Sequence, residues 1–366
     1  MTTTKLNNKS RQIQGVSVVD LFCGIGGLSH GFLQENFRIN AGVDLDKTCR
    51  YVFEANNSAP FLHKDICDVP GAELQSLYPK GDIKVLVGCA PCQPFSSYAF
   101  KHKDEGSKWK LLYEFARLVR EVQPEIVSME NVPQLLNFKR APVIKDFVDI
   151  LQADGYHVSY QVVYSPDYGI PQKRKRLVLL ASKLGPITLL SPTHGIKTYV
   201  TVRDIIGGLP AVSHGEAAPT DPLHKASGLS EKNLERVKQS RPGGNWKDWS
   251  SDLILDCHKK GSGKTYSAVY GRMEWDEPAP TITTQFFGLG SGRFGHPEQD
   301  RALTLREGAL LQTFPMTYRF VEEEGKHLSL ALIGKHIGNA VPVRLAQIIA
   351  KTIKVHLAEH GLIKNN

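Results

Sequence analysis

Short apolar segments that end in glycines or in an acid are the feature of this sequence that most restricts its fold. Residues 16–22 are largely apolar and run into a glycine-rich segment at 24–27. Leu28, Phe32 and Leu33 then follow at the spacing of one helix face. This order predicts a buried strand, a tight turn and an amphipathic helix.

The same alternation continues through the first half of the chain. Residues 112–119 carry apolar side chains at the i, i+3, i+4 and i+7 spacing of a helix. Further buried strands are predicted at residues 38–43, 83–87, 125–129, 158–164 and 177–180. Strands that alternate with helices predict an α/β fold with a doubly wound, mostly parallel sheet.

The composition and periodicity of the sequence change near residue 185, which indicates a second domain. The region that follows holds clusters of Gly, Pro, Ser and Thr and few long periodic segments. Helical spacing returns at residues 304–311 and from 343 to about 360. In a chain of 366 residues we therefore expect a first domain of residues 1–185, completed by 330–366, and a smaller irregular domain of residues 186–329.

Composition and charge exclude several classes of protein. Hydrophobic residues make up 41% of the chain, which fits a folded globular protein and rules out a disordered or collagen-like chain. No apolar run reaches the roughly 18 residues of a membrane span, and residues 1–14 lack an apolar secretion core, so we expect a cytoplasmic protein with no membrane partner. The net charge of +8 favours a polyanionic partner such as nucleic acid.

Six cysteines are spread through the chain, and a cytoplasmic location argues against a disulfide framework. Cys89 and Cys92 have the spacing of a zinc or redox pair, but no second pair completes four ligands, so no metal site is expected. Cys23, Cys49, Cys67 and Cys89 are interpreted as small buried apolar residues.

The glycine-rich segment at 24–27 is a candidate cofactor site. Glycines at the end of a strand let the backbone turn sharply and approach a ligand beside a helix N-terminus. Asp44 ends the next strand at the offset of a ribose-binding acid, and Asp65 offers an acceptor for an adenine amino group. Ser29 replaces the third glycine of the dinucleotide motif, which favours an adenosine-type cofactor without a pyrophosphate. The alternative is a plain glycine-rich turn.

Three more segments place reactive side chains near strand ends. Cys92 lies in a loop that two flanking prolines stiffen, at the carboxyl end of a predicted strand. Glu130 follows another strand and is expected to face the same crevice. Arg174 and Arg176 alternate along an extended segment and therefore share one of its faces. Taken singly, Glu130 is more simply interpreted as a solvated carboxylate, and the arginines as part of a basic surface strand. For Cys92 the rigid loop favours a functional thiol over a buried apolar residue.

Taken together and in this order, these segments closely resemble the DNA cytosine-5 methyltransferase family. The resemblance rests on Phe-x-Gly-x-Gly-Gly, Pro-Cys-Gln, Glu-Asn-Val and Gln-x-Arg-x-Arg, and it continues at residues 167–171, 301–307, 311–315 and 337–342. It spans residues 16–355 apart from the irregular segment. The resemblance implies an enzyme of the prokaryotic restriction-modification type, with a Rossmann-like S-adenosylmethionine-dependent fold and a target-recognition domain in residues 186–329.

The resemblance also implies a reaction, the transfer of a methyl group from S-adenosylmethionine to C5 of a cytosine that is flipped out of double-stranded DNA. Cys92 matches the nucleophile that adds to C6 and activates C5. Glu130 matches the acid that holds N3 and the exocyclic amine, and Arg176 matches the residue at O2, with Arg174 beside it. The implied cofactor contacts are Phe22 and Asp65 on the adenine, Asp44 on the ribose, and in addition Gly24, Ile25, Gly26, Ile66, Pro91, Leu111, Asn339 and Ala340.

DNA contacts are expected in the target-recognition region and in the loop after Cys92. The candidates are Gln93, Ser96, Arg241, Lys264, Arg272 and Thr281. The implied biological role is protection of host DNA against a cognate restriction endonuclease, with the enzyme acting as a monomer at the nucleoid. Residues 104–110 lack the arginine that the family usually has there, which bears only on the loop over the flipped base.

Other functions remain as alternatives. A tRNA cytosine-5 methyltransferase on the same fold would carry a Cys-Phe-Thr signature, whereas His258 follows Cys257 here. A catalytically silent DNA-binding regulator would be expected to lack Cys92 or Glu130, and both are present. The broken dinucleotide motif disfavours an oxidoreductase. Residues 261–265 look like the end of a phosphate-binding P-loop, but His258 occupies the position of its first glycine.

Overall fold

The computed structural model describes residues 12–91, 108–138, 141–260, 267–322 and 329–364. The chain divides into two compact units. Unit 1 consists of Met1–Val163, Lys175–Ser191 and Val343–Asn366, and unit 2 consists of Tyr164–Arg174 and Pro192–Pro342. The sequence had suggested boundaries at residues 185 and 330, so the units differ from that expectation chiefly in residues 164–174 and 330–342, which belong to unit 2.

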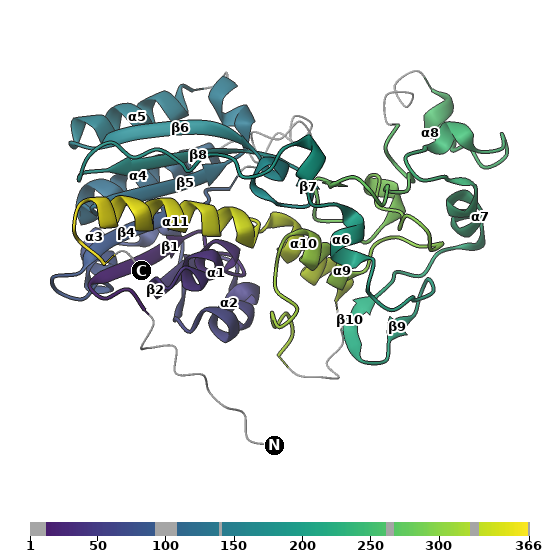
Figure 1. Cartoon of the computed structure of the whole chain (residues 1–366), viewed down its shortest axis with the longest axis horizontal. Coiled ribbons are helices and arrows are strands. Elements are labelled where there is room, and N and C mark those ends of the chain that lie inside the picture. Colours follow the sequence, from purple (N-terminus) through teal and green to yellow (C-terminus); the bar gives the residue numbers. More distant parts are fainter. Residues whose placement is uncertain (1–11, 92–107, 139–140, 261–266, 323–328, 365–366) are drawn as a thin grey trace. The chain divides into compact units, whose positions relative to one another are not determined.

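A seven-stranded sheet forms the centre of unit 1, in the order β3-β2-β1-β4-β5-β8-β6 (Figure 1). Its strands are β1 (Val16–Leu21), β2 (Arg38–Asp44), β3 (Phe61–His63), β4 (Ile83–Gly88), β5 (Ile126–Asn131), β6 (His157–Tyr164) and β8 (Lys175–Ser182). Strands β1 to β5 pair in parallel, and β8 pairs with β5 in the antiparallel sense. Every strand that the sequence predicts is present. Strand β3 was not predicted, because three residues are too few to show a pattern.

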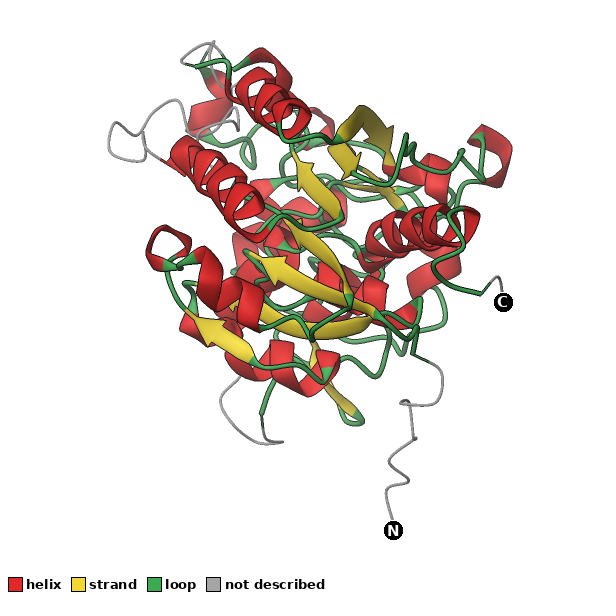
Figure 2. Ribbon diagram, turned by 90° about the vertical axis from the view of Figure 1, so that its left-hand side faces the viewer, coloured by secondary structure: helices red, strands yellow, loops and turns green. Residues whose placement is uncertain are grey.

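Helices cover both faces of this sheet (Figure 2). They are α1 (Gly27–Gln34), α2 (Arg50–Asn57), α3 (Gly71–Ser76), α4 (Leu111–Val122), α5 (Val143–Ala153) and α11 (Val343–Glu359). Helix α1 packs against α2 and α11, whereas α4 packs against α3 and α5. The predicted doubly wound α/β fold is therefore confirmed. No helix in the part of the chain that the structure describes is both long enough and apolar enough to cross a membrane.

The packing of unit 1 follows from its sequence pattern. All six residues of β1 are buried, as expected for a central parallel strand that is covered on both faces. Helix α4 buries one face, and Phe115 and Val119 on that face belong to the main core cluster. Gly31 lets α1 and α11 approach closely, because a Cβ at this position would lie 2.3 Å from the Cβ of Ala346.

Unit 2 contains two small sheets and several short helices. Strand β7 (Gln172–Lys173) pairs in parallel with β11 (Ala279–Pro280), and β9 (Ala217–Ala218) pairs antiparallel with β10 (Asp221–Lys225). The helices are α6 (Val202–Ile206), α7 (Glu231–Gln239), α8 (Asp256–Lys259), α9 (Leu305–Leu311) and α10 (Leu330–Asn339). The sequence predicts α9. It does not predict α7, whose side chains are mostly polar, or α10, which contains two glycines.

A buried ion pair and a capping box stabilise α9. Arg301 donates to both carboxylate oxygens of Glu307 at 2.8 Å, and each side chain is 1% exposed. Glu307 also accepts from the backbone N–H of Thr304, whose hydroxyl accepts from the N–H of Glu307 in return. Burial acts to raise the pKa of Glu307, but the bonds from Arg301 outweigh it and hold that pKa below its ordinary value. This carboxylate is therefore structural.

Candidate active site

The strand order of unit 1 reverses between β1 and β4, because β2 and β3 lie to one side of β1 and β4 lies to the other. Open α/β sheets bind ligands outside the carboxyl ends of their strands at such a point. Leu21 pairs in register with Gly88, so the turn after β1 and the loop after β4 begin at the same level. Two of the motifs that the sequence singles out therefore start side by side at this edge.

The turn after β1 has an unusual backbone. Phe22, Gly24 and Gly26 have φ angles of 58°, 50° and 85°, all in the left-handed region. A Cβ on Gly26 would lie 2.1 Å from Nδ2 of Asn57, so this position requires glycine for two reasons. Phe22 adopts the left-handed conformation in spite of its side chain, and strain of this kind is concentrated at functional sites.

Asp44, the last residue of β2, holds the turn from the neighbouring strand. One carboxylate oxygen accepts from the backbone N–H of Gly24 at 2.8 Å, and the other accepts from the N–H of Asp46 at 2.8 Å. Burial raises the pKa of Asp44 above its ordinary value, although these hydrogen bonds oppose the shift. The next residue, Leu45, is 62% exposed and offers an apolar surface beside this acid, a feature that the sequence reading missed.

The remaining cofactor candidates of unit 1 lie at the carboxyl ends of strands or on the helix that follows. Asp65 comes shortly after β3 and accepts from the backbone N–H of Cys67 at 3.0 Å, and Ile66 beside it is 3% exposed. Pro91 is half-buried after β4, and Leu111 is half-buried at the start of α4. Asn339 and Ala340 end α10 in unit 2, so their approach to the cofactor stays a prediction.

Glu130 lies near the end of β5 and is 2% exposed. Its neighbours come from the two strands that flank β5, because the loop after β4 supplies Cys89 and the start of β8 supplies Arg176. The Cys89 thiol donates to Oε2 with an Sγ to Oε2 distance of 2.8 Å, and Nε of Arg176 lies 2.9 Å from Oε1. A buried carboxylate thus meets a cation and a thiol at the same edge as the glycine turn.

Asn131 ties the loop after β4 to β5. Its Nδ2 donates to the carbonyl of Ala90 at 3.3 Å, and its Oδ1 accepts from the backbone N–H of Val132 at 2.9 Å. The Glu-Asn pair of the sequence motif therefore contacts the Cys89-Ala90 pair through two consecutive side chains. Beyond Pro91 the loop leaves the described residues, and Cys92, Gln93 and Ser96 lie outside them, as does Lys264 in unit 2.

Comparison with known proteins identifies the family. A sequence model described as C-5 cytosine-specific DNA methylase matches residues 16–355. The chain belongs to this family. The methylase is 54% identical over 338 residues to Type II methylase M.HgiDII of Herpetosiphon aurantiacus, with 92% of this chain and 95% of that protein covered. It is 32% identical to Type II methyltransferase M.PspPI of a Psychrobacter strain, with 92% and 78% covered.

Solved structures agree on the fold of the methylase. A putative DNA modification methyltransferase from an Escherichia coli prophage aligns with a TM-score of 0.73 at 22% identity, covering 94% of this chain and 99% of that one. The Entamoeba histolytica methyltransferase EhMeth aligns with a TM-score of 0.63 at 18% identity, covering 94% and 99%. The family match makes the protein an enzyme that methylates C5 of cytosine in DNA, as the sequence motifs predict.

The methylase keeps its two motif arginines in different units. Arg176 is the second residue of β8 in unit 1. Arg174 belongs to unit 2, where it is 4% exposed and donates to the carbonyl of Ile282 at 3.3 Å. The expected alternation is present, because Lys173 and Lys175 are exposed while the arginines between and after them are not. The predicted role of Arg174 next to the nucleophile stays a prediction.

One of the predicted DNA contacts is buried in unit 2. Arg272 is 5% exposed, and its guanidinium also forms an ion pair with Asp300. The carbonyls that accept from Arg272 are those of Val237, Ser240, His296 and Gln299. A guanidinium committed to this many buried carbonyls has a structural role, and the predicted contact of Arg272 with DNA gains no support from its position.

The other described candidates remain at the surface of unit 2. The side chain of Arg241 is 75% exposed and pairs with Asp248 at 2.9 Å. Thr281 is half-buried, and its hydroxyl donates to the carbonyl of Lys173 at 2.8 Å. Of the two, only Arg241 presents an exposed cation, so it is the stronger candidate for a phosphate contact.

The burial of the cysteines differs in part from the expectation. Cys23 and Cys49 are buried as expected, but Cys67 is exposed, and Cys89 is only half-buried and donates to Glu130. The interpretation of Cys67 and Cys89 as buried apolar residues is therefore wrong. One feature of the sequence could have predicted that Cys89 and Glu130 are neighbours, because each of them follows the apolar core of a strand by one or two residues.

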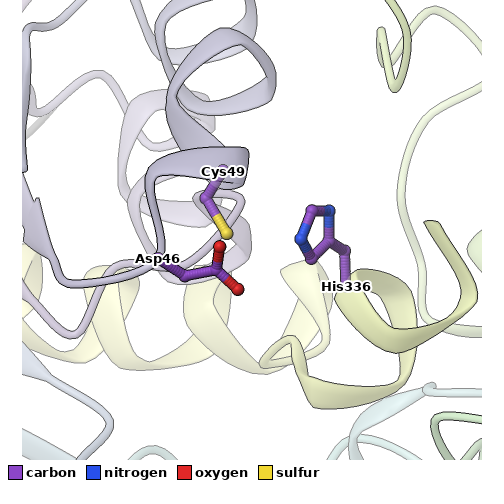
Figure 3. A group of neighbouring side chains, drawn as sticks. All are labelled: Asp46, Cys49 and His336. Carbon is purple, nitrogen blue, oxygen red and sulfur yellow. The ribbon is translucent and has the colours of Figure 1, made fainter. Parts of the chain in front are cut away.

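Figure 3 draws Asp46 and Cys49 from unit 1 together with His336 from α10 in unit 2. Asp46 begins the short 3-10 turn after β2, where its carboxylate accepts from the backbone N–H of Thr48 at 3.1 Å, and Cys49 ends that turn. Within unit 1 these two side chains supply fewer than the four ligands of a structural zinc site. They are assigned no metal.

Proposed function

We propose that this methylase transfers a methyl group from S-adenosylmethionine to C5 of a cytosine in double-stranded DNA through a covalent bond between Cys92 and C6. The observation that carries the proposal is the ion pair of the buried Glu130 with the half-buried Arg176, at the sheet edge that also holds the glycine turn. An acceptor beside a donor in a buried site matches the amino group, N3 and O2 edge of cytosine.

The residues around the turn fit the proposed cofactor. Asp44 and Asp65 offer carboxylate oxygens for ribose hydroxyls and an adenine amine, and the half-buried ring of Phe22 offers a face for the purine. A Cβ on Gly24 would meet no atom within 4 Å, so the backbone there is open to a ligand. S-adenosylmethionine, when bound, supplies a methyl group on a positively charged sulfur.

The protein side of the proposed reaction has three parts. The Cys92 thiolate adds to C6, which makes C5 the nucleophilic carbon of an enamine. Glu130 accepts from the exocyclic amine and shares a proton with N3, while Arg176 donates to O2, so the charge that develops on the ring is neutralised in a buried site. After C5 has formed its bond to the methyl group it gives up its proton to water. The electron pair of that C–H bond re-forms the C5–C6 double bond, and the bond from C6 to sulfur breaks to restore the thiolate.

The proposal includes base flipping and a role in restriction-modification. A base that is stacked in a duplex cannot be reached by a thiolate and a methyl donor from opposite faces, so the cytosine must leave the stack at a cost of roughly a few kcal/mol. The net charge of +8 supports binding to the phosphate backbone. The relatives named as Type II enzymes support protection against a cognate endonuclease. The enzyme is proposed to act as a monomer.

Bisulfite sequencing of plasmid DNA from cells that express the protein tests the reaction and reveals the target together. We expect protected cytosines within one short recurring sequence, and none when Cys92→Ala is expressed. Protected cytosines in the Cys92→Ala sample, or no protection by the wild type while purified protein methylates transfer RNA, would contradict the proposal.

A further inference from the structure

The carboxylate of Glu130 has an unequal set of neighbours. Among the described residues, the Cys89 thiol is the hydrogen-bond donor to Oε2, at 2.8 Å. Oε1 is buried and lies 2.9 Å from Nε of Arg176, but no described group donates a well-directed hydrogen bond to it. The charge of the arginine is therefore nearby, while the directional bond comes from the thiol.

This difference bears on how the carboxylate is oriented. The last torsion of a glutamate side chain is broad and roughly two-fold, so packing alone does not fix the plane of its two oxygens. A charge contact without hydrogen-bond alignment constrains distance more than direction. A hydrogen bond to Oε2 selects one orientation and leaves Oε1 available for a second donor.

The position of Cys89 is set by the sheet. Gly88 pairs with Met129 across β4 and β5, so the residue after β4 comes level with Glu130 on the adjacent strand. The backbone N–H of Cys89 donates to the carbonyl of Leu21 at 3.3 Å, which anchors it from β1 on the other side. The thiol thus reaches Glu130 from a fixed backbone.

We propose that Cys89 is a positioning residue, whose thiol holds the Glu130 carboxylate with Oε1 free to accept from the amino group of the target cytosine. The inference rests on the proposed role of Glu130 in binding the base. A serine at this position keeps a small O–H donor on the same Cβ, whereas alanine keeps the backbone and loses the donor.

Single-turnover methylation with radiolabelled S-adenosylmethionine tests this assignment. We expect Cys89→Ala to lower the methylation rate roughly ten- to a hundredfold at saturating DNA and cofactor, since small misplacements of catalytic groups cost about this much. The KM values and the melting temperature should stay close to wild type, and Cys89→Ser should restore the rate to within about threefold. Cys257→Ala, which removes an exposed thiol of unit 2, is the matched control and should be silent.

A Cys89→Ala rate within twofold of wild type, or a loss that serine fails to restore, overturns the inference. If Cys89→Ala is unstable, infrared spectroscopy of the wild type decides instead. The S–H band assigned to Cys89, by difference from Cys89→Ser, should shift when Glu130→Gln weakens the acceptor, and an unmoved band contradicts the bond. Glu130→Gln with normal methylation would instead overturn the proposed function, whatever Cys89→Ala does.

Discussion

Ser29 donates a hydrogen bond of 2.6 Å to the carboxylate of Asp20 and so joins the first turn of α1 to β1 beneath the glycine turn. Both side chains are fully buried, and the other oxygen of Asp20 has no hydrogen-bond partner among the described residues. Burial raises the pKa of Asp20 from its ordinary 3.8 to about 7. The acid is therefore largely protonated in the folded protein below neutral pH.

This pKa shift makes the stability of unit 1 depend on pH. Between about pH 4 and pH 7 the folded state holds a proton that the unfolded state has lost, so the free energy of unfolding must fall as the pH rises through this window and level off above it. The full effect is on the order of 4 kcal/mol. We expect Asp20→Asn to abolish this slope, so that it gains stability relative to wild type from pH 5 to pH 8 in urea unfolding.

Asp149→Asn is the control for the pH experiment, because Asp149 is an exposed acid of α5 that pairs with Lys145 at the surface. Its unfolding curve should follow the wild type at every pH. Parallel pH profiles for Asp20→Asn and wild type would show that the Asp20 carboxyl does not carry the proton.

The glycine turn yields a prediction about cofactor binding. Gly26→Ala forces a left-handed alanine, at about 1–2 kcal/mol, and also drives its Cβ into Asn57. We expect affinity for S-adenosylhomocysteine to fall at least about tenfold in titration calorimetry, which corresponds to about 1.4 kcal/mol. Gly81→Ala is a matched control, because Gly81 has a φ of 90° with no atom within 4 Å of its Cβ. It should lose a little stability and bind normally. Equal affinities of the two variants for S-adenosylhomocysteine would show that the glycine turn is not part of the cofactor site.

Two arginines of unit 2 should behave in opposite ways. Arg272→Ala leaves several buried carbonyls without a donor, and at roughly 1–3 kcal/mol for each unsatisfied group it should lower the melting temperature markedly. Arg241→Ala should melt like the wild type, and the slope of log DNA affinity against log salt should become shallower by about 0.9. A stable Arg272→Ala with weakened DNA binding would contradict the structural role and favour the predicted DNA contact.

The sequence allowed the sheet edge to be predicted because parallel strands obey a strong rule. A glycine turn, a Pro-Cys loop and a Glu-Asn pair each follow a buried strand, and carboxyl ends of parallel strands share one edge. Glu130 and Asp44 were located in this way. The family motifs then supplied roles that strand patterns alone leave open.

Side-chain partners were harder to predict, since residue type does not determine exposure. Arg272 is of a residue type that often contacts DNA, yet carbonyls from two segments far apart in the sequence surround it. Cysteine is a residue type that commonly packs in the apolar core. In this chain, however, the register of β4 and β5 turns the thiol of Cys89 toward a carboxylate. Such contacts depend on segments far apart in the sequence, which local periodicity does not record.

Mass spectrometry of the methylase after incubation with its target duplex carrying 5-fluorocytosine decides the mechanism. Fluorine replaces the hydrogen that must leave C5, so a thiolate that has added to C6 cannot be released once the methyl group is transferred. We expect a stable protein–DNA complex whose modified peptide contains the oligonucleotide on Cys92, and no complex with Cys92→Ala. A wild-type protein that turns over without attachment, or one that is attached through Cys89, would contradict the account.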